Sequence, residues 1–90
     1  MKPSIGRIVI AKNVLSNGAD EHPAIINRVW SDGDPAQGTV VAINVTVFPD
    51  CGAPLNQTSV FIFENRAAAD AFLVTQGDLK PVVCFWPDRA

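Results

Sequence analysis

The sequence predicts a mainly β domain, either a small antiparallel barrel of SH3-like size or a curved five-stranded sheet, with one short helix in its C-terminal half. Two observations support this fold class. Five short runs rich in β-branched and aromatic residues are separated by turn residues, and a single later segment has helical composition. The chain has 90 residues, of which 48% are hydrophobic. This length and composition favour one domain over residues 1–90 with its own core.

Three strands are expected in the first half of the chain. Residues 5–11 and 24–30 are rich in β-branched residues, and the polar segment 13–23 between them is predicted to be a loop with a turn at Asn17-Gly18. Residues 39–48 give the clearest strand, because apolar and polar side chains alternate there. Its expected buried face consists of Val41, Ile43, Val45 and Val47.

The second half adds two strands and the helix. Residues 58–64 predict a strand that is apolar on both faces, and residues 81–86 predict a last strand that ends at Pro87. Between them, residues 66–76 predict a helix that begins after Asn65 and stops at Gly77 and that covers an open end or edge of the sheet. A strand that is apolar on both faces needs a second cover, which is either this helix or a neighbouring subunit.

Composition excludes several classes of function. Charged residues make up only 18% of the chain and the net charge is −2, so general nucleic-acid binding is not expected. The same low fraction of charged residues gives a free monomer few charged side chains for its surface, which favours a homo-oligomer. No run of apolar residues is long enough to span a membrane, and a basic residue comes too early for a signal peptide. Cys51 and Cys84 are therefore interpreted as reduced thiols in a cytosol, the first exposed in a turn and the second in the core.

The sequence offers no catalytic set. His22 is the single histidine and is expected to be solvated in the polar loop. Asp32 and Asp34 lie in a predicted turn that lacks the alternating ligands of a calcium loop. We therefore predict a binding protein rather than an enzyme, with no metal and no cofactor.

The candidate ligand-binding residues combine arginine with tryptophan. They are Arg28, Trp30, Arg7, Trp86 and Arg89. A guanidinium group binds phosphate or carboxylate through two hydrogen bonds, and an indole ring stacks on a base. In the alternative interpretation the two tryptophans anchor a core or an interface, and the arginines extend into water.

Nearly the whole chain resembles a group of small phage and prophage accessory proteins. The similar segments occur in the same order with turn-length gaps, at residues 3–9, 23–30, 43–52, 58–60 and 85–89. The chain departs from the group at Ile10 and Ala11, where His-Tyr is common, and at Cys84, where the group has a second tryptophan. The resemblance implies a phage protein made in the cytoplasm of a bacterial host.

Two functions remain open at this point. The first is a homo-oligomeric sponge that sequesters an anionic nucleotide immune signal, by analogy with small phage proteins of the Thoeris anti-defence and anti-CBASS types. Its arginines would contact phosphate, and its tryptophans would stack on the base or form a wall of the pocket. The alternative is an SH3-like protein-interaction module that inhibits a host or phage protein, with edge strands and Trp30 at the contact.

Overall fold

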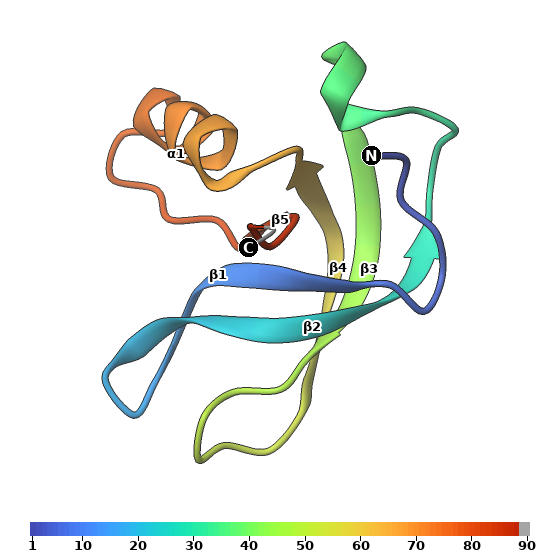
Figure 1. The fold of residues 1–90 in the computed structure, drawn as a ribbon. Coiled ribbons are helices and arrows are strands. Elements are labelled where there is room, and N and C mark those ends of the chain that lie inside the picture. Colours follow the sequence, from blue (N-terminus) through green and yellow to red (C-terminus); the bar gives the residue numbers. More distant parts are fainter. Residues whose placement is uncertain (89–90) are drawn as a thin grey trace.

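The computed structural model describes residues 1–88, which form a closed five-stranded β-barrel with one helix (Figure 1). This architecture confirms the predicted mainly β fold class with one short helix. The elements in chain order are β1 (Ile8–Ser16), β2 (Ala19–Val29), the 3-10 helix η1 (Pro35–Gln37), β3 (Val41–Val47), β4 (Leu55–Phe63), α1 (Arg66–Thr75) and β5 (Val83–Phe85).

The barrel closes through its shortest strand. Strands β1 to β4 pair in sequence order and antiparallel, whereas β5 pairs antiparallel with β1 and parallel with β4. A parallel pair needs a long crossover connection, and the segment that contains α1 supplies it. Each of the five strands therefore has two neighbours. Within residues 1–88, β5 pairs with β1 only from Ile10 to Lys12 and with β4 only at Ile62 and Phe63, so the closure covers part of these two strand edges. The contact through edge strands that the alternative expects stays a prediction.

The main core fills the barrel as the alternation in the third strand predicted. Val41, Ile43, Val45 and Val47 are fully buried, which confirms their predicted face. Strands β1, β2, β4 and β5 contribute further buried side chains, among them Ile26. Burying a side chain of this size stabilises the fold by about 1.5–3 kcal/mol, so these positions hold the barrel together.

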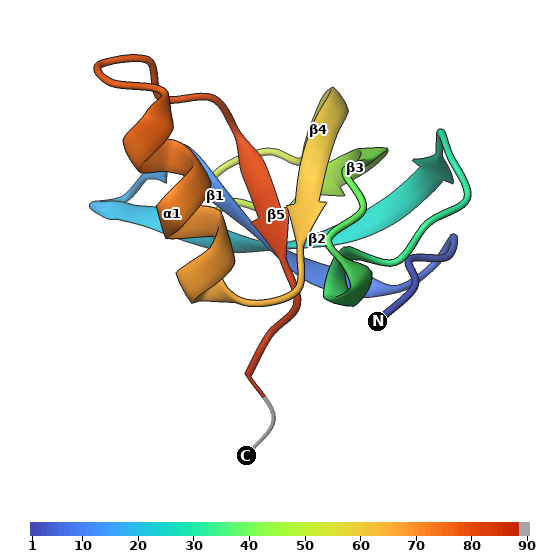
Figure 2. The same ribbon diagram turned by 90° about the horizontal axis from the view of Figure 1, so that it is seen from above.

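Helix α1 supplies the second cover that the fourth strand needs. The Asn65 side chain caps it by accepting a hydrogen bond from the backbone N–H of Ala68 at 2.8 Å, as its position predicted. Phe72 then packs against Phe61 and Phe63 on the outside of β4, with ring centroids 5.7 and 5.1 Å away. Figure 2 shows the helix lying alongside β5. For this strand the helix is the cover, so its two apolar faces do not require a neighbouring subunit.

The predicted loop over residues 13–23 is wrong. This segment is a hairpin, in which β1 continues to Ser16 and β2 begins at Ala19, and only the Asn17-Gly18 turn signal is confirmed. Both turn residues have positive φ, at 50° and 78°, as a two-residue hairpin turn requires. The apolar pattern did not reveal these strands because polar side chains occupy them, and a bulge after Lys12 interrupts the register.

His22 is also not the solvated loop residue that was expected. It lies in β2, is 3% exposed, and uses both ring nitrogens. Nδ1 accepts a hydrogen bond from the backbone N–H of Asp50 at 3.1 Å, so the ring proton is assigned to Nε2, which donates to the carbonyl of Ala19 at 3.0 Å. The ring therefore ties the first hairpin to the turn between β3 and β4. The hydroxyl of Ser16 adds a bond to the Asp50 carbonyl at 2.7 Å.

We expect the substitution His22→Ala to lower the free energy of unfolding by about 2 kcal/mol, because it removes a buried ring together with its two partly buried hydrogen bonds, to the Asp50 N–H and the Ala19 carbonyl. The measurement is urea unfolding at neutral pH. The control is Ser16→Ala, which removes an exposed hydrogen bond to the same residue and should cost less than about 1 kcal/mol. Equal losses for the two variants would contradict a special role of His22.

Candidate functional site

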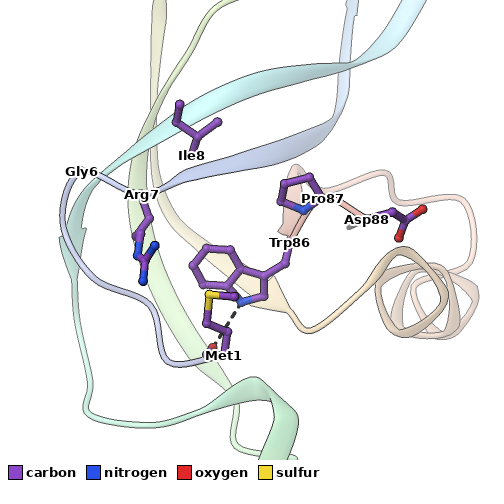
Figure 3. A pocket seen from close by; sticks show the side chains of 7 residues that line it. All are labelled: Met1, Gly6, Arg7, Ile8, Trp86, Pro87 and Asp88. Carbon is purple, nitrogen blue, oxygen red and sulfur yellow. Dashed lines mark hydrogen bonds between the residues drawn. The ribbon is translucent and has the colours of Figure 1, made fainter. Parts of the chain in front are cut away.

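A cavity of about 430 Å³ lies where the N-terminal segment passes the end of β5 (Figure 3). Its volume lies within the range of about 300–1,000 Å³ that is usual for small-molecule sites. The lining residues are Met1, Gly6, Arg7, Ile8, Trp86, Pro87 and Asp88. Arg7 and Trp86 were candidates from the sequence. Of the other five, Gly6, Ile8, Pro87 and Asp88 lie in segments that carry the resemblance but were not singled out as ligand-binding residues, and Met1 carried no signal.

The backbone around Gly6 positions Arg7. Gly6 has φ of +90°, a conformation that glycine adopts without strain. Its N–H donates to the carbonyl of Ile26 at 2.8 Å, and the Ile26 N–H donates to the carbonyl of Arg7 at 2.9 Å. These two bonds extend the pairing with β2 just ahead of β1. They hold Arg7 at the mouth of the barrel, where its side chain lies across from the Trp86 ring (Figure 3).

Trp86 forms a wall of the cavity. It is only 6% exposed and belongs to the barrel core. Its indole N–H donates to the carbonyl of Met1 at 3.2 Å, which holds the N-terminal segment against the ring. Because most of its ring surface is covered, Trp86 does not offer a free face to stack on a base. The interpretation as a core anchor therefore applies to this tryptophan.

The second arginine–tryptophan pair lies elsewhere. The guanidinium carbon of Arg28 is 3.8 Å from the ring centroid of Trp30, within cation–π distance, and Trp30 is 48% exposed. Neither residue lines the cavity at Arg7. Arg89 lies outside the described residues. The five candidates therefore do not form one site: Arg7 and Trp86 share a cavity, and Arg28 and Trp30 form a separate exposed stack.

Some cationic side chains are engaged in ion pairs within the fold, and others have no acidic partner there and could bind an anionic ligand. Lys2 pairs with Asp32, and Lys12 and Arg66 share Glu21 at 3.2 and 2.7 Å. Within residues 1–88, three cationic side chains have no acidic partner at ion-pair distance. These are Arg7, Arg28 and Lys80. Arg7 can therefore bind an anion without first breaking an ion pair. Asp88 at the rim of the same cavity is partly neutralised by Arg66 at 3.6 Å.

The two cysteines lie in different surroundings, one in the core and one in an exposed turn. Burial raises the pKa of the Cys84 thiol to about 12, so it stays protonated at neutral pH, and its place in the core confirms the sequence prediction. Cys51 is exposed in the turn after Asp50, also as predicted. Across the described chain, no group of three or more His, Cys, Asp or Glu residues could hold a metal ion. None of the helices in residues 1–88 has the length and apolar character to cross a membrane.

Comparison with known proteins finds no family model, no curated protein and no solved structure that matches this chain. The resemblance to small phage and prophage proteins stays a prediction from the sequence pattern.

The ion pairs of Glu21 with Lys12 and Arg66, called the Glu21 network below, predict that the stability of the fold depends on pH in the acidic range. The hydrogen bond from Arg66 is the largest effect on the pKa of Glu21; burial opposes it and Lys12 adds to it, and together they hold this pKa below its usual value of 4.5. A lowered pKa in the folded state contributes stability that is complete above pH 4.5 and is lost as the pH falls through the folded value. We therefore expect Glu21→Gln to flatten the fall in unfolding free energy in this acidic range.

The measurement is urea unfolding at a series of pH values from neutral down to acid. Asp78→Asn is the control, because Asp78 has no ion pair within residues 1–88, and this variant should keep the slope of the wild-type chain. An unchanged acid slope in Glu21→Gln would show that the network does not couple Glu21 to folding.

Proposed function

We propose that this chain binds a small anionic ligand in the cavity at Arg7 without transforming it. The observation that carries the proposal is an arginine with no acidic partner in residues 1–88, facing a cavity of ligand size. A phosphate or carboxylate there would accept charge-assisted hydrogen bonds from the guanidinium group. Ile8, Trp86 and Pro87 would contact the apolar part of the ligand.

The ligand class that we propose is an anionic nucleotide, with its phosphate at Arg7 and its base against Ile8 and Pro87. Such a division is supported by Arg7 on one side of the cavity and by the apolar side chains of Ile8 and Pro87. The carboxylate of Asp88 also lines the cavity, and Arg66 pairs with it at 3.6 Å. In the setting that the resemblance implies, the chain would hold a nucleotide immune signal in the bacterial cytoplasm and so act as a sponge. His22 is not available as a general base for turnover, because both its nitrogens are engaged in the core.

We further propose that the sponge is a homo-oligomer that associates beside the first hairpin and the end of the helix. Leu15, Val74 and Leu79 are between 71% and 81% exposed. Val74 and Leu79 line one hollow of about 360 Å³ and Leu15 lines another of about 250 Å³, and both hollows include Asn13 and Lys80. Aliphatic side chains gathered in this way favour a covered surface.

The binding proposal is tested by native mass spectrometry and calorimetry with a panel of cyclic nucleotides and cyclic ADP-ribose isomers. We expect a nucleotide to be retained unaltered. Arg7→Gln should weaken its binding about 10- to 100-fold, the usual effect of losing a hydrogen bond to a charged group. The matched control is Arg28→Gln, which makes the same change of charge outside the cavity and should bind like the wild-type chain. Retention of no member of the panel, or wild-type binding by Arg7→Gln, would contradict the proposal.

The oligomer is tested by sedimentation velocity. We expect the wild-type chain to sediment as an oligomer and the double variant Leu15→Ser with Leu79→Ser as a monomer, because polar side chains there remove the gain from covering the aliphatic surface. Val40→Ser is the control, since Val40 is also exposed but lines a different hollow. A wild-type monomer, or a double variant that still associates, would show that this surface is not the interface.

A further inference from the structure

The exposed Arg28–Trp30 stack at the end of β2 is held in place by residues of two further strands, β3 and β4. The indole N–H of Trp30 donates to Oδ1 of Asn44 at 2.8 Å, and the backbone N–H of Ser59 donates to the same oxygen at 2.8 Å. Trp30 follows β2, Asn44 lies in β3 and Ser59 lies in β4. Two donors on one oxygen fix the orientation of the Asn44 amide. Its Nδ2 group has no hydrogen-bond partner within residues 1–88, so it can donate to a bound molecule.

A second set of hydrogen bonds continues along the same outer surface. Asn27 Nδ2 donates to the hydroxyl of Thr46 at 2.7 Å, and that hydroxyl donates to Oδ1 of Asn56 at 2.9 Å. Thr46 is two residues from Asn44 in β3, so both side chains point to the outside of the barrel. The outer surface of β2, β3 and β4 therefore presents a row of polar groups in fixed positions beside the arginine and the tryptophan.

The backbone is distorted on both sides of this row. The pairing of β2 with β3 shifts register between Ile26 and Arg28, and the pairing of β3 with β4 shifts at Asn44. Ser59, which lies opposite this second shift, has φ of +54° although it is not glycine. Bulges and left-handed residues of this kind persist where they aim particular groups, often at functional sites. Here the distortion directs the Ser59 N–H at Asn44, which in turn holds Trp30.

The chemistry of this surface indicates what would cover it. Arg28 has no carboxylate partner in residues 1–88, and half of Trp30 is open, so a partner would supply a carboxylate and an apolar group. Exposed tryptophan and arginine are also the residues that dominate binding energy at protein interfaces. A nucleic acid would need several cations spaced along its backbone, whereas this stack offers one and the chain has a net charge of −2.

We propose that the Arg28–Trp30 surface binds a segment of another protein that carries a carboxylate next to an apolar side chain. The carboxylate pairs with the guanidinium of Arg28, and the apolar side chain packs on the open part of the Trp30 ring. The Asn44 amide donates to a backbone carbonyl of the segment. This surface is separate from the cavity at Arg7, so the inference does not depend on ligand binding there.

The test is a selection of short random peptides on the immobilised full chain, followed by affinity measurement of the enriched sequences. We expect these sequences to share an aspartate or glutamate beside an apolar residue. Arg28→Gln should weaken their binding about tenfold or more, and Trp30→Ala by at least as much. Arg28→Lys, which keeps the charge but not the planar fork, should retain an intermediate affinity.

The matched control is Lys80→Gln, which removes another cation that has no acidic partner in the described chain and should leave peptide binding unchanged. Arg7→Gln should also leave it unchanged, which separates this inference from the proposed function. Circular dichroism of each variant shows whether the barrel is retained. Enriched peptides that lack acidic residues, or that bind Arg28→Gln like the wild-type chain, would overturn the proposal. Binding of single-stranded oligothymidylate in place of the peptides, lost in Arg28→Gln, would overturn it in favour of nucleic acid.

Discussion

The closure of the barrel by the three residues of β5 is the constraint on which the rest of the structure depends. Val83, Cys84 and Phe85 are all buried, because the strand is paired on both sides and the helix packs against it. Trp86 follows directly, and its backbone N–H donates to the carbonyl of Phe63 at 3.3 Å. The end of β5 is therefore held beside the N-terminal segment, and the cavity at Arg7 forms where these two parts meet.

Some charged side chains stabilise the fold through ion pairs, while two arginines stay unpaired within residues 1–88. The hairpin of β1 and β2 is joined to the helix through Glu21, which binds both Lys12 and Arg66. The Met1 ammonium group pairs with Asp34, which precedes η1, at 2.9 Å and with Glu64, which follows β4. These pairs hold Met1, which lines the cavity, against the two elements. These pairs use much of the acidic surface near the helix and the N-terminus. Arg7 and Arg28 remain without acidic partners in residues 1–88, each next to a different tryptophan.

The two arginine–tryptophan pairs show why residue type alone does not define a site. In the sequence, arginine lies near tryptophan at Arg28 and Trp30 and at Trp86 and Arg89, whereas Arg7 is far from any tryptophan. The fold brings Arg7 and Trp86 to the same cavity. In the barrel, one ring is taken into the core and its arginine faces a cavity, which suits a small ligand. The other ring stays half open with its arginine stacked upon it, which suits a larger partner. Burial, which depends on the closure of the sheet, makes the difference.

The sequence by itself determined the local features: the alternating third strand, the turn at Asn17-Gly18, the helix after Asn65 and the buried Cys84. Each of these follows from short-range periodicity, capping or backbone preference. The tertiary structure decided what depends on contacts between distant residues. It extended the first two strands through polar residues, buried His22 against Asp50, and separated Arg7 from Arg28. Such contacts arise only when the barrel closes, because the partners lie tens of residues apart in the chain.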